Sequence, residues 1–557
     1  MSEAYRRLTS HLPDRHVASE NAFAAEPRAV KAWIDALPMA NFAVASRRVL
    51  DALRDLNRQR VDGVQRLDAL ELLRRPLAEL AAYTDRQILG ASFPLPAAKA
   101  ELGELALAFQ GELATGYRIA LAELCAPAGG VPFLRGRHVA LAALRALQHG
   151  GAHLAKAYLL YRTPAAGAWR ALHDVHRFAA ELRLDDRAAE PGATPRAAYL
   201  EALLVALANP YRFTQREQGE VAAFARALVP YAELRDRNGG ERDLAVPYDA
   251  DRGPGYLADE RGDARRGAPA LHLDGVHARV DAQLAAAAGA ATATLRLSDG
   301  AAEIDAALAR RVAAGWRARA ERGHPRLGGG YVLDSVLGLH ELHSALAGGE
   351  EFASFLRRVR GEAISLGGGE HAAAWRGAAE VGRAPRRPVR VLDQSLGGYR
   401  VLWERAPSGD GLRVRVADLV GLALPARSEL GDADWMVGVV RWLRIDEQGG
   451  IDAGIELLAR RALAAAARRS GDARTPVRAL LLASTAADPG FDYSELLVPA
   501  ELERGADEVE LVAPVDLHGV PAPARAERVQ GLRHLETIGL YERFALAAAG
   551  GDGAGAA

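Results

Sequence analysis

Apolar residues recur at three- and four-residue spacing through most of the first 235 positions. Segments such as AVKAWIDAL (29–37) place their apolar side chains on one face of a helix. Proline and glycine breaks, FPLP (93–96) and APAGGVP (126–132), separate successive segments. The pattern predicts an all-helical domain over residues 1–235. No repeat keeps its register along it, so a bundle and an irregular solenoid both remain open.

The periodicity then becomes mixed. Residues 236–269 are rich in Gly, Pro, Asp and Arg, which predicts a linker or long loop. Residues 270–365 predict a mixed α/β middle region, with a strand and helix in ALHLDGVHARVDAQLAAAA, a strand in TATLRLSD, and helix throughout GYVLDSVLGLHELHSALAGGEEFASFLRRVRGEA. The Gly-rich stretch 366–382 predicts a flexible segment.

From about residue 384 the alternation becomes two-fold, as in PVRVLD, GYRVLWER and WMVGVVRWLRID. This pattern predicts an antiparallel β-barrel over 383–470, with one helix in LLARRALAAAARRS (457–470). Residues 471–546 predict a β-rich extension or a second barrel, and 547–557 a disordered tail. The fold class is therefore α+β multidomain: an all-helical N-terminal half, a C-terminal barrel and an additional β-rich tail.

Composition narrows the classes of function. The hydrophobic fraction is 49% and the charged fraction 25%, which is ordinary for globular proteins, and the net charge is -1. Such a balance gives no reason to expect DNA, RNA or a membrane surface as partner, so an anion site must be local. Lysine occurs only at 31, 99 and 156, so arginine supplies nearly all the basic residues. Arginine spacing is therefore weak evidence by itself, and we interpret Arg322-GHP-Arg326 as a chance pattern.

The single cysteine, Cys125, excludes an intramolecular disulfide and lies in an apolar helical segment, where a buried side chain is expected. The N-terminal sequence has no apolar stretch of the signal-peptide type, and no run is long enough for a membrane span. A cytoplasmic location is expected.

We find no constellation of residues that predicts catalysis. His340 and His343 are three apart and lack the metalloprotease pattern, so we interpret them as a surface helix pair and expect no metal site. No nucleophile elbow, P-loop or dinucleotide-binding glycine motif occurs. The chain is not expected to be an enzyme, to have catalytic residues or to need a cofactor.

One stretch, VGRAPRRPVRVLDQSLGGYRV (381–401), combines several arginines with Asp393-x-Ser395-x-x-Gly398 and then an apolar strand. An R-x-x-x-R pair followed by D/N-x-S-x-x-G on a small antiparallel barrel resembles the PilZ domain, the bacterial receptor domain for cyclic di-GMP. Two later strands, GVVRW (438–442) and GIEL (454–457), resemble the closing strands of that barrel. The resemblance covers roughly residues 383–460.

The resemblance implies a site for cyclic di-GMP, with Arg383 and Arg387 at the two arginine positions and Arg386 also in range. It places Asp393, Ser395 and Gly398 in the second motif. These residue types suit the ligand, since arginine forks bind phosphate and the guanine edge. A carboxylate accepts from guanine N–H groups, and glycine permits close approach of the backbone.

The spacing departs from the family pattern. Typical members have a strand and a hairpin between the two motifs, whereas five residues separate Arg387 from Asp393. Either the first strand is lost or rearranged, or the true arginines lie elsewhere, or the barrel no longer binds nucleotide. Alternatively, the arginines solvate the start of a strand and DQSLGG is a plain β-turn.

Two functions remain open. In the first, the resemblance implies a bacterial signalling protein that binds cyclic di-GMP, and the helical half docks an unknown protein partner, in surface motility or pilus control. In the second, the barrel is a degenerate PilZ-like scaffold that binds proteins but not nucleotide.

Overall fold

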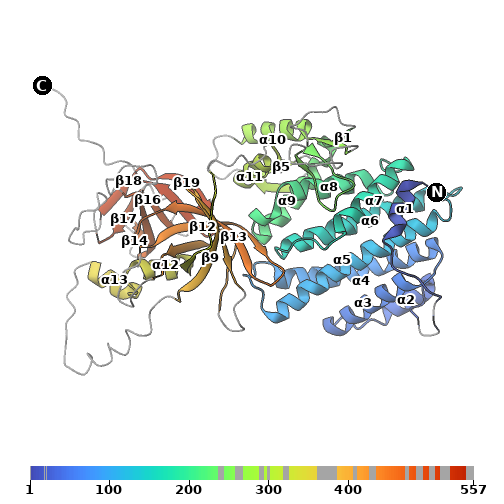
Figure 1. Cartoon of the computed structure of the whole chain (residues 1–557), viewed down its shortest axis with the longest axis horizontal. Helices are drawn as coiled ribbons and strands as arrows, with labels where there is room; N and C mark the ends of the chain where they lie inside the picture. Colours follow the sequence, from blue (N-terminus) through green and yellow to red (C-terminus); the bar gives the residue numbers. More distant parts are fainter. Residues whose placement is uncertain are drawn as a thin grey trace. The chain divides into compact units, whose positions relative to one another are not determined.

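A computed structural model of the chain is shown in Figure 1. It describes residues 2–17, 19, 22–235, 244–256, 268–287, 294–297, 302–317, 325–359, 385–404, 411–425, 434–470, 476–483, 493–500, 508–514 and 527–546. The chain divides into two compact units, the first made of residues 1–91 and 95–321, the second of residues 92–94 and 322–557. The expected architecture of a helical N-terminal half, a barrel and a β-rich tail is confirmed.

The first unit is built mainly from long helices. Their starts carry the polar caps that helix ends need: Asn41 accepts from the Val44 amide, and Thr214 forms a capping box with Glu217. The helices are α1 (Glu3–Ser10), α2 (Pro27–Asp35), α3 (Phe42–Arg58), α4 (Gly63–Ile88), α5 (Ala97–Leu124), α6 (Gly136–Leu159), α7 (Ala168–Glu181), α8 (Pro195–Leu207) and α9 (Gln215–Leu228), with 3-10 turns η1 (Pro210–Arg212) and η2 (Val229–Tyr231).

Buried ion pairs join distant helices of this unit. Arg66 of α4 is fully buried, with Nε 2.7 Å from Oε2 of Glu123 at the end of α5, and two further nitrogens donate to backbone carbonyls of Leu56 and Gln59. Cys125, beside Glu123, is buried as expected, and burial raises the pKa of its thiol to about 12. Such a thiol is an unreactive packing group.

The remainder of the first unit is a small α/β region that packs against α8 and α9. Trp316 is buried there, where its Nε1 donates to the Leu204 carbonyl at 3.0 Å and its ring stacks on Phe224. A four-stranded sheet of order β1-β4-β2-β3 accompanies it. The elements are β1 (Glu233–Arg235), β2 (Leu244–Ala245), β3 (Gly255–Tyr256), β4 (Ala270–His272), α10 (Asp274–Ala286), β5 (Thr294–Leu297), β6 (Ala302–Asp305) and α11 (Ala306–Arg317).

The predicted boundaries in the middle of the chain need revision. The described part of the predicted linker 236–269 contains strands β2 and β3, so it is not all loop. The predicted middle region 270–365 does not form one body, because the division between the two units falls at residues 321 and 322. The predicted flexible segment 366–382 and the tail 547–557 lie outside the described residues.

The second unit begins with a closed antiparallel barrel of strand order β10-β13-β12-β11-β8-β9, in which β9 also pairs with β10. Strand β7 pairs with the far end of β9. The strands are β7 (Leu327–Gly328), β8 (Val332–Leu337), β9 (Arg387–Ser395), β10 (Gly398–Trp403), β11 (Leu419–Ala423), β12 (Met436–Ile445) and β13 (Ile451–Ala459). The helix predicted across 330–363 is therefore wrong at its start, because residues 332–337 supply a barrel strand between β9 and β11.

Two helices, α12 (Gly338–Leu346) and α13 (Phe352–Val359), follow β8. Leu339 and Leu342 of α12 pack in one apolar cluster with residues of the barrel and of a second sheet. That sheet has the order β18-β17-β14-β15-β16-β20-β19. Its strands are β14 (Ala462–Arg469), β15 (Val477–Ala483), β16 (Tyr493–Pro499), β17 (Glu508–Val512), β18 (Glu527–Gln530), β19 (Arg533–Ile538) and β20 (Tyr541–Ala545).

The helix predicted over 457–470 is wrong, since β13 ends at Ala459 and β14 occupies Ala462–Arg469. Alanine favours helices intrinsically, but the packing of β14 overrides that preference. Ala464 and Ala466 face one apolar cluster, under α13, and Ala465 and Ala467 face another, within the sheet. Both faces of the strand are covered closely, so small side chains are needed on each.

Within the described residues, every helix is either too short or too polar to cross a membrane.

Candidate functional site

A shallow pocket of about 250 Å³ lies on the barrel, where β9, β10, β12 and β13 meet. Its walls come from the hairpin that joins β9 to β10 and from the two neighbouring strands. The lining residues are Arg326, Asp393, Ser395, Gly397, Gly398, Tyr399, Arg441, Trp442, Gly454, Ile455 and Glu456. Cations, carboxylates, a hydroxyl and an indole are thus gathered in one hollow.

The hairpin between β9 and β10 forms one rim of this pocket. Ser395 and Gly398 face each other in its register, and the Ser395 hydroxyl donates to the Gly398 carbonyl at 3.4 Å. Gly398 has a φ of +154°, and a Cβ built on it would lie 2.0 Å from the Ile455 carbonyl oxygen. Only glycine lets β10 approach β13 this closely, so the residue shapes the pocket through the backbone.

Trp442 lines the pocket in contact with a second glycine. A Cβ built on Gly454 of β13 would lie 1.9 Å from Nε1 of Trp442, so the indole occupies the space that a side chain would fill. The ring is half-buried and lines the pocket. A half-exposed indole held in this way is a surface on which a planar base can stack.

Arg326 provides a cation among the lining residues. β7 pairs with the end of β9 so that Leu327 lies opposite Gln394 and Gly328 opposite Asp393. This register brings Arg326, which immediately precedes β7, to the pocket, and its Nη1 lies 2.6 Å from Oδ1 of Asp393. Both side chains keep part of their surface exposed. The guanidinium and the carboxylate therefore retain free hydrogen-bonding capacity toward the pocket.

Two further arginines add charge here: Arg441 lines the pocket, and Arg400 lies over the ring of Trp442. Nε of Arg441 lies 2.6 Å from Oε2 of Glu456, and its Nη2 lies 2.5 Å from Oε1 of Glu536 in β19. Burial alone would lower the pKa of Arg441, but the two carboxylates raise it overall. Arg400 makes a two-point ion pair with Asp452, at 3.0 and 2.7 Å, 6.0 Å above the Trp442 ring. The hydrogen bond to Asp452 raises the pKa of Arg400, so both cations stay charged.

The predicted site residues divide into two groups. Asp393, Ser395 and Gly398 line the pocket together. Arg386 and Arg387 do not: the Arg386 guanidinium lies 5.5 Å over Trp435, and Arg387 lies 3.8 Å from Glu341. Arg387 and Asp393 are six positions apart on the extended strand β9, a separation of about 20 Å. Arg383 lies outside the described residues.

Sequence reasoning missed Arg326, whose spacing from Arg322 was interpreted as chance. The feature that could have pointed to Arg326 is the strand that follows it, Val332–Leu337. This strand lies between the pair of arginines and Asp393, as the family pattern requires. Arg322 itself lies outside the described residues. Of the alternatives that the shortened spacing left open, this placement supports the one in which the arginines lie elsewhere.

The paired histidines of α12 differ from the expected surface pair. His340 is exposed, but His343 is buried and its Nε2 lies 3.0 Å from the Ala465 carbonyl oxygen. Burial lowers the pKa of His343 to about 4, so the ring is neutral and donates from Nε2. Among the residues that the structure describes, no group of three or more potential ligands could hold a metal ion.

Comparisons with known proteins agree with this description. Residues 28–238 match the family described as "Cyclic-di-GMP receptor FimW, N-terminal domain", and residues 369–463 match "Cyclic-di-GMP receptor FimW, middle PilZ domain". The chain is 26% identical over 522 residues to the cyclic-di-GMP receptor FimW of Pseudomonas aeruginosa, across 83% of this chain and 82% of the relative. No solved structure gives a significant match. The predicted resemblance to the PilZ family is confirmed.

Proposed function

We propose that the chain is a receptor for cyclic di-GMP and that the ligand binds in the pocket on its barrel, because residues 369–463 match the model of a PilZ domain. One observation carries the proposal: Arg326, Asp393, Ser395 and Trp442, from separate parts of the chain, line one hollow. The chain acts in this proposal by binding, without catalysis and without a cofactor.

Each wall of the pocket matches a part of the ligand. Cyclic di-GMP carries two phosphodiesters and two guanines, and the Arg326 guanidinium suits either a phosphate oxygen or the O6/N7 edge of guanine. Asp393 uses Oδ1 for Arg326, which leaves Oδ2 to accept from guanine N1–H and N2–H. The Ser395 hydroxyl can rotate from the Gly398 carbonyl to a phosphate, and Trp442 can stack on a base.

The experiment is an anisotropy titration of the full chain with fluorescently labelled cyclic di-GMP. Unlabelled cyclic di-GMP is expected to displace the label. Cyclic di-AMP should not displace the label, because adenine has neither the O6 acceptor nor the N1–H and N2–H donors that Asp393 requires. Equal displacement by both nucleotides would contradict the assignment of Asp393, and absence of any binding would contradict the receptor function.

A ligand-free scaffold remains the second candidate. The placement of Arg386 and Arg387 away from Asp393 and Ser395 favours it. Arg326 weakens that argument, because it supplies the cation from another part of the chain. The anisotropy titration separates the two functions.

We further propose that the helical unit docks a protein partner, in a cytoplasmic signalling role that includes motility or pilus control. The loop between α5 and α6 supports the docking, since Phe133 and Leu134 are 90% and 84% exposed and adjacent. The double substitution Phe133→Ser and Leu134→Ser should abolish partner capture while leaving cyclic di-GMP affinity unchanged. Loss of nucleotide binding in this variant would contradict a separate docking role.

A further inference from the structure

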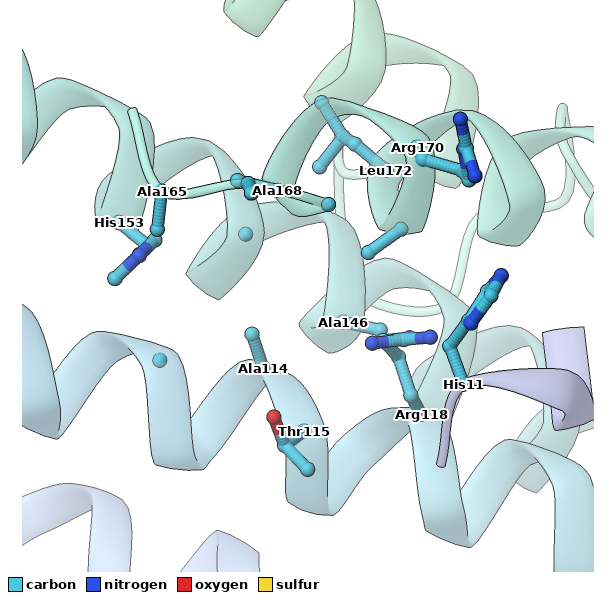
Figure 2. Close-up of a pocket in the computed structure, with 15 residues that line it drawn as sticks. His11, Ala114, Thr115, Arg118, Ala146, His153, Ala165, Ala168, Arg170 and Leu172 are labelled. Atoms are coloured by element: carbon cyan, nitrogen blue, oxygen red, sulfur yellow. The ribbon is translucent and has the colours of Figure 1, made fainter. Parts of the chain in front are cut away.

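A second cavity lies wholly within the helical unit, where the end of α1 meets α5, α6 and the start of α7 (Figure 2). Its volume is about 350 Å³, which is in the range of small-molecule sites. The lining residues are His11, Gly111, Ala114, Thr115, Arg118, Ala146, Gly150, His153, Ala165, Ala166, Gly167, Ala168, Arg170, Ala171 and Leu172. None of these described residues carries a carboxylate.

Arg118 of α5 is the unusual member of this lining. Its Nε and Nη2 are buried, and neither has a hydrogen-bond partner among the described residues. Burial lowers the pKa of its guanidinium, and the charge of Asp174 on α7 offsets part of that effect. An arginine remains charged in any protein environment, so its unpaired buried nitrogens cost stability. Such a cost is expected where an anion completes the site.

Two other basic side chains converge on the same space. Figure 2 shows the side chains of His11, at the end of α1, Arg118 of α5 and Arg170 of α7 around the same cavity, which all three line. The amides at the start of α7 are already occupied, because Asp251 accepts from Gly167 and Arg170 at 2.5 and 3.0 Å. The positive character of the cavity therefore comes from side chains rather than from the helix terminus.

His153 supplies a different kind of group. Its Nδ1 lies 3.0 Å from the Leu107 carbonyl oxygen, and burial lowers its pKa, so the ring is neutral with the proton on Nδ1. Nε2 is then an acceptor. The ring packs on Gly111, where an added Cβ would lie 3.3 Å from it. His153 can therefore accept a hydrogen bond from a ligand hydroxyl.

The remaining walls are made of small residues that leave room for an uncharged portion of the ligand. A Cβ on Gly150 would lie 2.7 Å from Cδ1 of Leu172, so this glycine lets α6 and α7 approach. Ala114, Ala146 and Ala168 complete this part of the surface. A cavity of about 350 Å³ exceeds what a single inorganic phosphate fills.

We propose that this cavity binds a small phosphorylated metabolite that carries hydroxyl groups. Arg118 and Arg170 hold the phosphate, His11 adds a donor, and His153 accepts from a hydroxyl. The site is separate from the barrel pocket, and it gives the helical unit a ligand of its own.

The test is calorimetry on the full chain at low salt with three probes: ribose 5-phosphate, inorganic phosphate and ribose. Ribose 5-phosphate is expected to bind, inorganic phosphate to bind more weakly, and ribose not to bind. Saturating cyclic di-GMP should not displace ribose 5-phosphate. Arg118→Met should weaken phosphate binding by about tenfold or more, whereas Arg216→Met, on the exposed surface of α9, should not.

A measurement of stability separates this role from a structural one. Arg118→Met removes a guanidinium with two buried nitrogens that have no hydrogen-bond partner among the described residues, and it also removes the attraction to Asp174. These two effects oppose each other, so the melting temperature without probe is expected to change little. Arg145→Met, which breaks the buried ion pair with Glu71, is expected to lower it. A drop for Arg118→Met as large as that for Arg145→Met would assign Arg118 to the fold. Failure of both phosphate probes to bind wild-type protein at millimolar concentration would overturn the proposal.

Discussion

Arg326 and Asp393 are 67 positions apart in the chain, yet Nη1 of one lies 2.6 Å from Oδ1 of the other on the wall of the barrel pocket. The contact is produced by the pairing of β7 with β9, which sets Gly328 opposite Asp393. Arg326 precedes β8, α12 and α13 in the chain, and Asp393 follows them. The contact therefore joins a cation and a carboxylate from the two sides of this long segment. The pocket exists only when the register between these strands is formed.

Arg326→Ala is expected to weaken cyclic di-GMP binding by about tenfold or more, because it removes a charge-assisted hydrogen bond to the ligand. The measurement is the dissociation constant by anisotropy. Arg386→Ala and Arg387→Ala serve as matched controls, since both side chains contact groups outside the pocket. A large loss in either control with none in Arg326→Ala would reverse the assignment.

The site shows which features local sequence could predict. Asp393, Ser395 and Gly398 lie in one hairpin, so a contiguous motif is enough to predict that they lie close together. Arg326 reaches them only through β7 and β8, with two helices inserted before β9. Strand register across such an insertion is a tertiary property. In a chain with abundant arginine, spacing could not distinguish Arg326 from Arg387.

The fold shows the same limit. Helical periodicity predicted the first unit well, because its helices are long and each buries one face. The helix predicted in the alanine-rich segment that forms β14 is wrong, because burial on both faces of a strand outweighs helix propensity. The helix predicted at residues 332–337 is wrong because a short apolar pattern of six residues does not distinguish a strand from the start of a helix.

Trp442→Leu is expected to weaken cyclic di-GMP binding by roughly 10- to 100-fold, in line with about 1–3 kcal/mol for stacking of a base on an aromatic ring. Trp442→Phe should keep part of the affinity, because a smaller ring still offers a stacking face. The comparison of the two dissociation constants is the measurement. Equal losses for Leu and Phe would argue against stacking.

Gly398→Ala is expected to lower the free energy of unfolding of the second unit by about 2–4 kcal/mol, because the new Cβ would lie 2.0 Å from the Ile455 carbonyl oxygen. Urea denaturation measures the change. Gly328→Ala, where an added Cβ meets no atom within 4 Å, is the matched control and should be nearly neutral. Similar stability of the two variants would contradict the close approach of β10 and β13.

Asp418 predicts a pH-dependent effect on stability. Burial raises the pKa of its carboxyl to about 6, above its value of 3.8 in the unfolded chain, so the folded state binds the proton more tightly. Its favourable contribution is complete below about pH 4 and is lost as the pH rises through 6. Asp418→Asn is therefore expected to stabilise the protein, by about 1 kcal/mol more at pH 8 than at pH 5.

Urea denaturation at pH 5 and pH 8 measures this difference. Asn can still accept from the Arg415 amide, which lies 2.7 Å from Oδ2 of Asp418. Asp434→Asn, which replaces an exposed carboxylate, is the control and is measured at the same two values of pH. A gain for Asp418→Asn that is independent of pH would exclude the titration of this carboxyl as its cause.

The central claim is that the barrel pocket binds cyclic di-GMP. Isothermal titration calorimetry of the wild-type full chain with cyclic di-GMP, at tens of micromolar protein, tests it most directly. We predict a saturable heat of binding that is strongly reduced in Arg326→Ala. Absence of any heat from the wild-type protein under these conditions would contradict the account and leave the ligand-free scaffold as the function of the barrel.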